Sequence, residues 1–197
     1  ASHELRTPLA SIRGYAELTR RSGAELPEDV RHSLNRIESE ATRMTALVED
    51  LLLLARLDEG RELEHAQVDL SRIVVDAVSD AHAAGPDHIW DIDIPEVPVE
   101  VVGDQARLHQ VVVNLLANAR VHTPAGSTVQ VVLEQSEESV QLRVIDNGPG
   151  IPADQMPELF ERFTRGDVSR TRATGSTGLG LAIVNAVVHA HNGSVSV

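Results

Sequence analysis

The chain has 197 residues and a net charge of −13, with 17 arginines and no lysine. This acidic balance disfavours binding to a nucleic-acid backbone, the absence of cysteine excludes disulfides and thiolate metal sites, and no run approaches the roughly 20 apolar residues of a membrane span. The length allows one or two domains. We therefore expect no nucleic-acid partner and no membrane contact for this part of the chain.

The first predicted helix runs from the start of the chain to about Arg21. Its apolar residues recur at the spacings of a helical bundle, namely Leu5, Leu9, Ile12 and Ala16. His3 lies roughly 200° around the helix from Leu5, so we expect its side chain in solvent. Thr7 shares the face of His3, and Glu4 is an adjacent carboxylate that can accept an imidazole proton. This pattern suits a nucleophilic histidine, although an isolated His–Glu pair is usually only a solvated surface pair.

The second predicted helix begins after Ser22, Gly23 and Pro27 and extends to about residue 58. Its apolar residues keep a four-three alternation that is typical of a coiled coil, namely Val30, Leu34, Ile37, Ala41, Met44, Val48, Leu51 and Ala55. Two such helices form a hairpin whose seam is half covered, and pairing two hairpins into a four-helix bundle buries it. We predict a homodimer through residues 1–58. The alternative is a hairpin that packs on the second domain of its own chain.

Residues 59–67 are polar and without period, so we interpret them as a linker. Residues 68–197 follow a different pattern, that of a second domain. The expected helices span residues 70–81, 104–121 and 179–190, and the expected strands span 88–94, 97–102, 128–135 and 139–145, with another beginning at Val195. Asp69 or Ser71 opens the first of these helices and Asp104 the second. The predicted fold is an α+β sandwich, a mixed sheet under three long helices.

Two asparagines, Asn114 and Asn118, share one face of the predicted helix 104–121. Asparagine is a poor residue for a helix interior, and its amide oxygen is a suitable Mg²⁺ ligand. Alone, the pair would be better explained as two amides that cap neighbouring loops.

Two glycine clusters flank the irregular stretch before the last helix. Asp146 directly follows a predicted strand and can accept a hydrogen bond from an exocyclic amine, while Gly148 and Gly150 allow the backbone to approach a flat ring. As an isolated motif this segment is only a turn. The second cluster contains Gly175, Gly178, Leu179 and Gly180 and opens the last helix, where free N–H groups favour phosphate.

Residues 2–9 resemble the phosphoacceptor box of the sensor histidine kinases of bacterial two-component systems. The asparagine pair and the two glycine clusters, in this order, resemble the N box and glycine boxes of the ATP-binding fold that these kinases share with type II topoisomerases, a heat-shock chaperone and mismatch-repair ATPases. Phe160 and Phe163 stand between them like the kinases' F box. The resemblance covers nearly the whole chain. It implies an all-α hairpin that forms a dimeric four-helix bundle, followed by an α+β sandwich ATP-binding domain.

The resemblance assigns roles in the first domain residue by residue. His3 is the phosphorylated residue, Glu4 the general base, and Thr7 the residue that positions water for dephosphorylation of the partner.

In the second domain, the resemblance implies that Asn114 and Asn118 hold Mg²⁺ against the phosphates of ATP. Asp146 binds adenine in a pocket shaped by Gly148 and Gly150. The segment around Gly178, Leu179 and Gly180 cradles the phosphates. Residues 164–177 are the expected ATP lid, with Gly175 as a hinge and Arg165 as a contact to the γ-phosphate.

One position departs from the family pattern. Many relatives have a lysine three residues after the second asparagine, where this chain has Val121. His122 fits the aromatic position that follows. Whether Arg120 or His122 replaces the missing cation is left open by the sequence.

The implied function is ATP-dependent autophosphorylation of His3 followed by transfer to an aspartate of a response-regulator receiver domain, together with phosphatase activity towards that regulator. The chain would then be the cytoplasmic portion of a sensor kinase anchored in the inner membrane. One alternative is an ATP-hydrolysing clamp, which needs a glutamate base where this chain has Asn114. Another is a nucleotide-binding dimeric scaffold without kinase activity. Whether phosphorylation occurs within or between chains is also left open.

Thr7→Ala is expected to leave autophosphorylation intact and to slow dephosphorylation of the response regulator several-fold, because the variant loses the group that orients water. The release of phosphate from a phosphorylated regulator, measured with each variant, tests this role. Unchanged rates for both reactions would contradict it.

Overall fold

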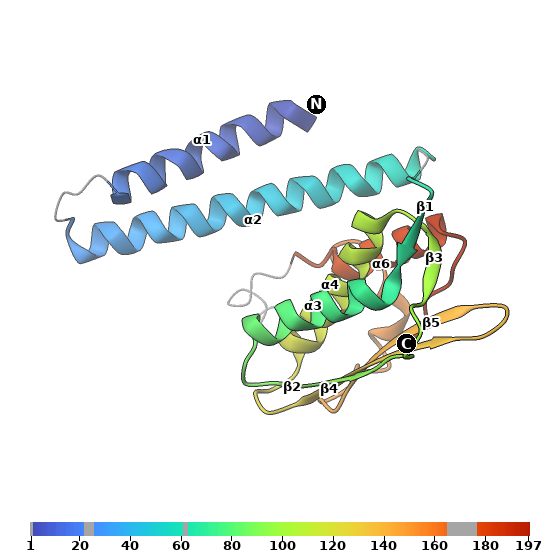
Figure 1. Cartoon of the computed structure of the whole chain (residues 1–197). Coiled ribbons are helices and arrows are strands. Elements are labelled where there is room, and N and C mark those ends of the chain that lie inside the picture. The colour runs from blue at the N-terminus through green and yellow to red at the C-terminus, as the bar shows by residue number, and fades with distance from the viewer. Residues whose placement is uncertain (1, 22–25, 61–62, 165–176) are drawn as a thin grey trace. The chain divides into compact units, whose positions relative to one another are not determined.

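The computed structural model describes residues 2–21, 26–60, 63–164 and 177–197, with side chains from residue 7 onward. The chain divides into two compact units, Ala1–Glu59 and Gly60–Val197. Figure 1 shows the helices of the first unit and the mixed helices and strands of the second. No helix in the described ranges is long and apolar enough to span a membrane.

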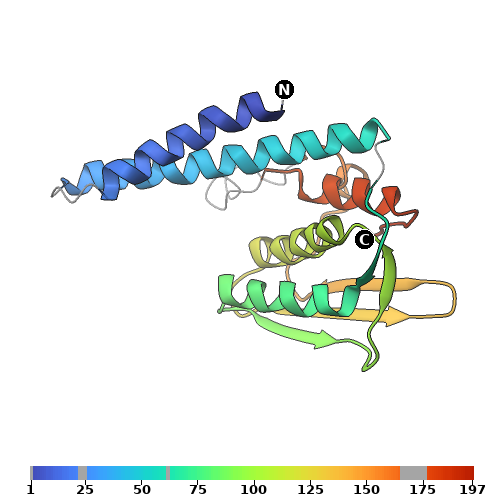
Figure 2. The ribbon, with the colours of Figure 1, turned by 45° about the horizontal axis from the view of Figure 1, so that its top comes forward.

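The first unit is a hairpin of two long helices, α1 (Ser2–Arg21) and α2 (Glu28–Asp58). Pro27 stands at the N-cap of α2, and two acidic residues occupy its first turn, where the helix dipole favours negative charge. The helices lie side by side in both views (Figures 1 and 2). They are linked by an ion pair between Arg20 Nε and Glu38 Oε2 at 3.1 Å, which is too exposed to contribute much stability.

The seam of this hairpin is only partly covered. Leu9, Ala16 and Ala41 are buried. Other apolar positions of the predicted seam are exposed, among them Ile12 (48%), Ile37 (45%) and Met44 (45%). These exposed positions leave an apolar stripe along the single hairpin, which is the feature from which the sequence predicted pairing with a second copy.

The second unit begins with β1 (Ala66–Asp69) and α3 (Leu70–Ala84), followed by β2 (Ile89–Asp93), β3 (Glu100–Gly103) and α4 (Gln105–His122). It continues with β4 (Thr128–Gln135), β5 (Val140–Asp146), the 3₁₀ helix η1 (Met156–Glu158) and α6 (Gly180–Ala190). The strand order β2-β4-β5 forms a mixed sheet in which β2 is parallel and β5 antiparallel to β4. Strands β1 and β3 form a separate antiparallel pair.

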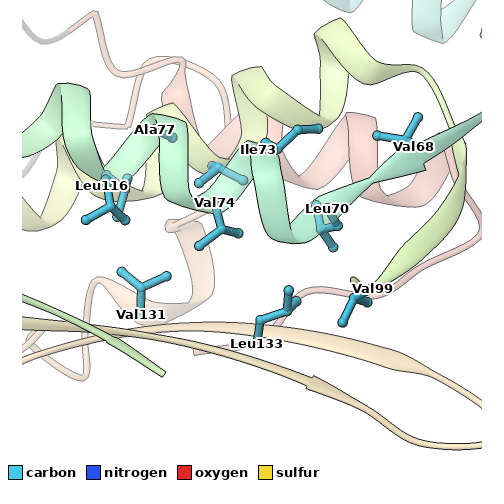
Figure 3. Packing of buried hydrophobic residues seen from close by; sticks show 11 residues of the cluster. Val68, Leu70, Ile73, Val74, Ala77, Val99, Leu116, Val131 and Leu133 are labelled. Atoms are coloured by element: carbon cyan, nitrogen blue, oxygen red, sulfur yellow. The ribbon is translucent and has the colours of Figure 1, made fainter. Parts of the chain in front are cut away.

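Helices α3 and α4 cover one face of the mixed sheet (Figure 2). Apolar side chains of α3, including Val74, point down toward Val131 and Leu133 of β4, and Leu116 of α4 joins the same cluster (Figure 3). All four are at most 2% exposed. Burial of these aliphatic side chains is the main stabilising contribution to this layer arrangement.

The structure corrects three sequence predictions. Strand β1 begins at Ala66 and so includes the last two residues of the expected linker 59–67, and it pairs with β3, so the strands form two sheets rather than one. The four residues of this strand alternate between apolar and polar side chains, but so short a run is not distinctive in the sequence. No strand forms at Val195, because residues 193–197 pair with no described strand.

The starts of α3 and α4 are capped as expected. Asp69 and Asp104 each accept a hydrogen bond from a backbone N–H in the first helical turn. His191, just after α6, accepts a hydrogen bond from Asp104 N at 3.0 Å and bonds Val187 O through Nδ1 at 2.8 Å. This contact ties the end of α6 to the start of α4, the two helices that carry the candidate site.

Val99→Ala is expected to destabilise the second unit by about 2 kcal/mol, because two buried methyl groups are lost at roughly 0.8 kcal/mol each and a cavity remains. Val99 is fully buried, whereas Val97 is 73% exposed, so Val97→Ala is the matched control and should change stability little. Urea unfolding followed by the fluorescence of Trp90, the single tryptophan, reports on this unit. Equal effects of both variants would contradict the assigned core.

Candidate functional site

The asparagine face of α4 meets the first residue of α6. Asn114 Nδ2 donates a hydrogen bond to Gly180 O at 3.2 Å, and Asn118 Oδ1 lies 4.0 Å from where a Cβ on Gly180 would be. The Asn118 amide nitrogen is buried and has no hydrogen-bond partner among the described residues. A buried donor without a partner costs about 1–3 kcal/mol, so this end of the amide suits a site that a ligand completes.

The N-terminus of α6 has features that favour an anion. In the described part of the chain, Leu179 at the N-cap supplies no capping side chain, Thr177 Oγ1 accepts from Leu179 N at 3.4 Å, and no acidic residue lies in the first turn. Leu179 is fully buried and anchors the segment, while Gly178 adopts a φ of 71°, a conformation that glycine accepts without strain. Free N–H groups and the helix dipole together make such an end favourable for phosphate.

The segment before α6 is tied to the F-box residue Phe163. Its N–H donates to Gly178 O at 3.0 Å, and its φ of 65° is uncommon for an aromatic residue. This bond joins the two chain segments on either side of residues 165–176.

The Asp146 turn (residues 146–150) follows β5. Gly148 N–H donates to Asp146 Oδ1 at 2.9 Å, which leaves the second carboxylate oxygen without a partner among the described residues. The Asn147 side chain accepts from Thr128 N at 2.9 Å, so the turn is also fixed to the start of β4. Gly150 has a φ of 74°. Asp146 is exposed and can therefore receive a donor from a bound molecule.

The end of α4 contacts this turn. A Cβ on Gly148 would lie 2.6 Å from Thr123 Cγ2, so the backbone of the turn is packed directly against the threonine methyl. One helix thus contacts both glycine clusters, through Asn114 at Gly180 and through Thr123 at Gly148.

Comparison with known proteins matches both units. A family model of the His Kinase A (phospho-acceptor) domain matches residues 1–60, and a model of the histidine kinase-, DNA gyrase B- and HSP90-like ATPase matches residues 103–197. The Mycobacterium tuberculosis protein named "Probable sensor histidine kinase TcrY" is 66% identical over 197 residues, which are 100% of this chain and 41% of that protein.

Solved structures agree with these matches. The mycobacterial sensor histidine kinase MprB is 32% identical, with a TM-score of 0.57, over 65% of this chain and 80% of that chain. Full-length ShkA in complex with AMPPNP is 27% identical, with a TM-score of 0.75, over 96% of this chain and 39% of that chain.

The chain belongs to the sensor histidine kinases. It spans about two fifths of the length of curated relatives such as TcrY. The predicted family and fold class are thereby confirmed.

In this sensor histidine kinase the residues predicted for phosphotransfer lie in α1. His3 and Glu4 are in its first turn, and their side chains lie outside the described part of the structure. Thr7 is exposed, and its carbonyl accepts a hydrogen bond from Ser11 Oγ. The predicted lid residues Arg165 and Gly175 lie outside the described ranges.

The structure orients the two candidates for the missing cation differently. Arg120 packs its aliphatic chain on Gly85, because a Cβ on that glycine would lie 2.6 Å from Arg120 Cδ. Arg120 is about 200° around α4 from Asn118 and therefore away from the asparagine face. His122 is exposed and four residues from Asn118, on the same side of the helix.

Two residues at this site were missed by the sequence analysis. Thr123 follows the last residue of α4 and contacts Gly148, and its hydroxyl is hydrogen-bonded to His88, which immediately precedes β2. Thr123 directly follows a predicted helix, and this position could have indicated that it caps the C-terminal end of that helix. His88 has no comparable sequence signal, because its partner lies 35 positions away.

Gly148→Ala is expected to lower stability, whereas Gly180→Ala is not. The added methyl at Gly148 would overlap Thr123 and should cost about 1–3 kcal/mol. At Gly180 the nearest atoms lie at 3.8 Å or beyond, and alanine restricts the unfolded chain, so that variant should be neutral or gain up to about 1 kcal/mol. Urea unfolding of each variant measures both, and equal destabilisation would contradict the geometry.

Proposed function

We propose that this chain is a kinase core that binds ATP in its second unit, phosphorylates His3 in its first, and passes the phosphoryl group to a response regulator. The observation that carries the proposal is that α4 and the residue after it contact both glycine clusters, while the buried amide nitrogen of Asn118 has no partner in the described ranges of the chain. ShkA, whose structure contains AMPPNP, supports a nucleotide at the equivalent fold.

Each cluster would bind a different part of ATP. The free carboxylate oxygen of Asp146 accepts a hydrogen bond from the adenine 6-amino group, while the Gly148 N–H keeps the other oxygen in place. The N-terminus of α6 binds the phosphates through N–H groups at and after Gly180, where the helix dipole favours negative charge. These two ends define the direction in which the nucleotide lies across α4.

The asparagine face fits a metal ion beside the phosphates. Asn114 donates through Nδ2 to Gly180, which leaves its Oδ1 as an oxygen ligand, and Asn118 offers a second amide next to the same residue. These residues would hold Mg²⁺, which supplies positive charge against the phosphate oxygens when bound.

Transfer requires the γ-phosphate to meet the imidazole of His3, in the same or another chain. A lone pair on one ring nitrogen forms the bond to phosphorus, and the bond from phosphorus to the β–γ bridging oxygen breaks, so that ADP leaves. The proton on the other ring nitrogen passes to Glu4. The phosphoryl group then moves to a carboxylate oxygen of an aspartate in the receiver domain, and the imidazole regains a proton.

Two partners follow from this activity. A second copy of the chain would cover the exposed seam of the hairpin at residues 1–58, because Ile12, Ile37 and Met44 are apolar and uncovered in one copy. A response regulator would receive the phosphoryl group, with Thr7, exposed one turn from His3, serving dephosphorylation. The chain would form part of a membrane-anchored sensor.

Labelling with [γ-³²P]ATP and Mg²⁺ tests the proposal. The wild-type chain and a His32→Gln control, which removes an exposed histidine of α2, should both acquire label that is stable in base and labile in acid. His3→Gln should acquire none, because it removes the nucleophile. Label that persists in His3→Gln, or that is stable in acid, would contradict phosphorylation at this residue.

A further inference from the structure

We propose that Thr123 and His88 form a positioning pair that holds Asp146 for recognition of the nucleotide base, an inference that rests on the proposed binding of ATP. Neither residue need touch the nucleotide. Both act through the Asp146 turn, whose backbone the methyl group of Thr123 supports at Gly148.

The hydrogen bonds around Thr123 fix the orientation of its side chain. Thr123 Oγ1 lies 2.7 Å from Ala119 O, which can only accept, so the single hydroxyl hydrogen is used there. His88 Nε2 lies 3.0 Å from Thr123 Oγ1. Because the hydroxyl hydrogen is already used, His88 Nε2 must be the donor in this second contact. With both bonds made, χ1 of Thr123 is held in one rotamer.

That rotamer directs the Thr123 methyl into the turn. The methyl carbon would be 2.6 Å from a Cβ on Gly148, and only glycine fits so close to it. The N–H of Gly148 in turn donates to Asp146 Oδ1 at 2.9 Å. A change in the Thr123 rotamer would therefore move Gly148, and with it the carboxylate that we assign to the base.

The pair is buried enough for these contacts to persist. Thr123 is 9% exposed. His88 Nδ1 is buried and has no partner among the described residues. The same ring lies 6.1 Å from the Trp90 ring, centroid to centroid, which limits its movement. A buried imidazole nitrogen without a hydrogen-bond partner costs stability, so a histidine is a poor choice for hydrophobic packing alone. The hydrogen bond that His88 donates to Thr123 explains why a histidine occupies this position.

The consequence is a prediction about base selectivity. Asp146 accepts from the 6-amino group of adenine, whereas guanine has an oxygen at that position. A carboxylate that is held in place favours binding of adenine over guanine. A displaced carboxylate discriminates less between the two bases. Disrupting the hydrogen bond between His88 and Thr123 should therefore weaken the binding of ATP more than the binding of GTP. The phosphate contacts at α6 are common to both nucleotides and remain.

The test measures dissociation constants of mant-ATP and mant-GTP with Mg²⁺ for the whole chain. Thr123→Ser loses the methyl group and Thr123→Val loses the hydroxyl, while His88→Phe keeps a ring but loses the donor. Each variant should reduce the preference for ATP over GTP on the order of tenfold, the value of one weakened neutral hydrogen bond. In the combined variant His88→Phe with Thr123→Val, the loss should be no greater than in either single variant, because both remove the same bond.

Thr45→Ser is the matched control. Thr45 lies in α2 and donates to Ala41 O at 2.8 Å, the same contact four residues back that Thr123 makes, but in the first unit. The preference of the Thr45→Ser variant for ATP over GTP should equal that of the wild type.

A purely structural role would lower the fraction of folded protein equally for both nucleotides and leave their ratio unchanged, and that result would overturn the inference while leaving ATP binding intact. Additive losses in the combined variant would also overturn it. Wild-type protein that binds neither nucleotide, or both equally, would instead refute the proposed function itself.

Discussion

The hydrogen bond from Asn114 of α4 to the carbonyl of Gly180 in α6 joins two residues that lie 66 positions apart in the sequence. It places the N-terminus of α6 beside the asparagine face of α4, and His191 fixes the opposite end of α6 to the start of α4. With both ends held, the asparagine face of α4 and the first turn of α6 have one relative position. Packing of these two helices is therefore the constraint on which the candidate site depends.

Those features that depend on neighbouring residues could be predicted from the sequence. Asp104 caps α4 because an N-cap bond spans only three residues, and β5 ends at Asp146, within one residue of the predicted end. The bond of His88 to Thr123 and the packing of Arg120 on Gly85 could not be predicted, because they join separate elements and leave no periodic pattern. Strand β1 was missed for a related reason, since its pairing with β3 defines it more than its own four residues do.

The proposed chemistry divides between the two units. The first carries the predicted phosphoacceptor on a helix whose seam stays partly exposed, and the second carries the candidate nucleotide-binding residues beside a sheet covered by helices. The second unit has its own buried core around Val74, Leu116 and Val131. A core of this kind gives the candidate nucleotide-binding residues a fixed arrangement without any contribution from the first unit.

The central claim is that three separated segments form one nucleotide site, and hydrogen–deuterium exchange with and without Mg-ATP tests it most directly. The account predicts slower exchange on nucleotide binding in the C-terminal half of α4, in residues 146–150 and in the first turn of α6, with no change in the β1–β3 pair. Protection of only one segment, or protection centred on β1 and β3, would contradict it.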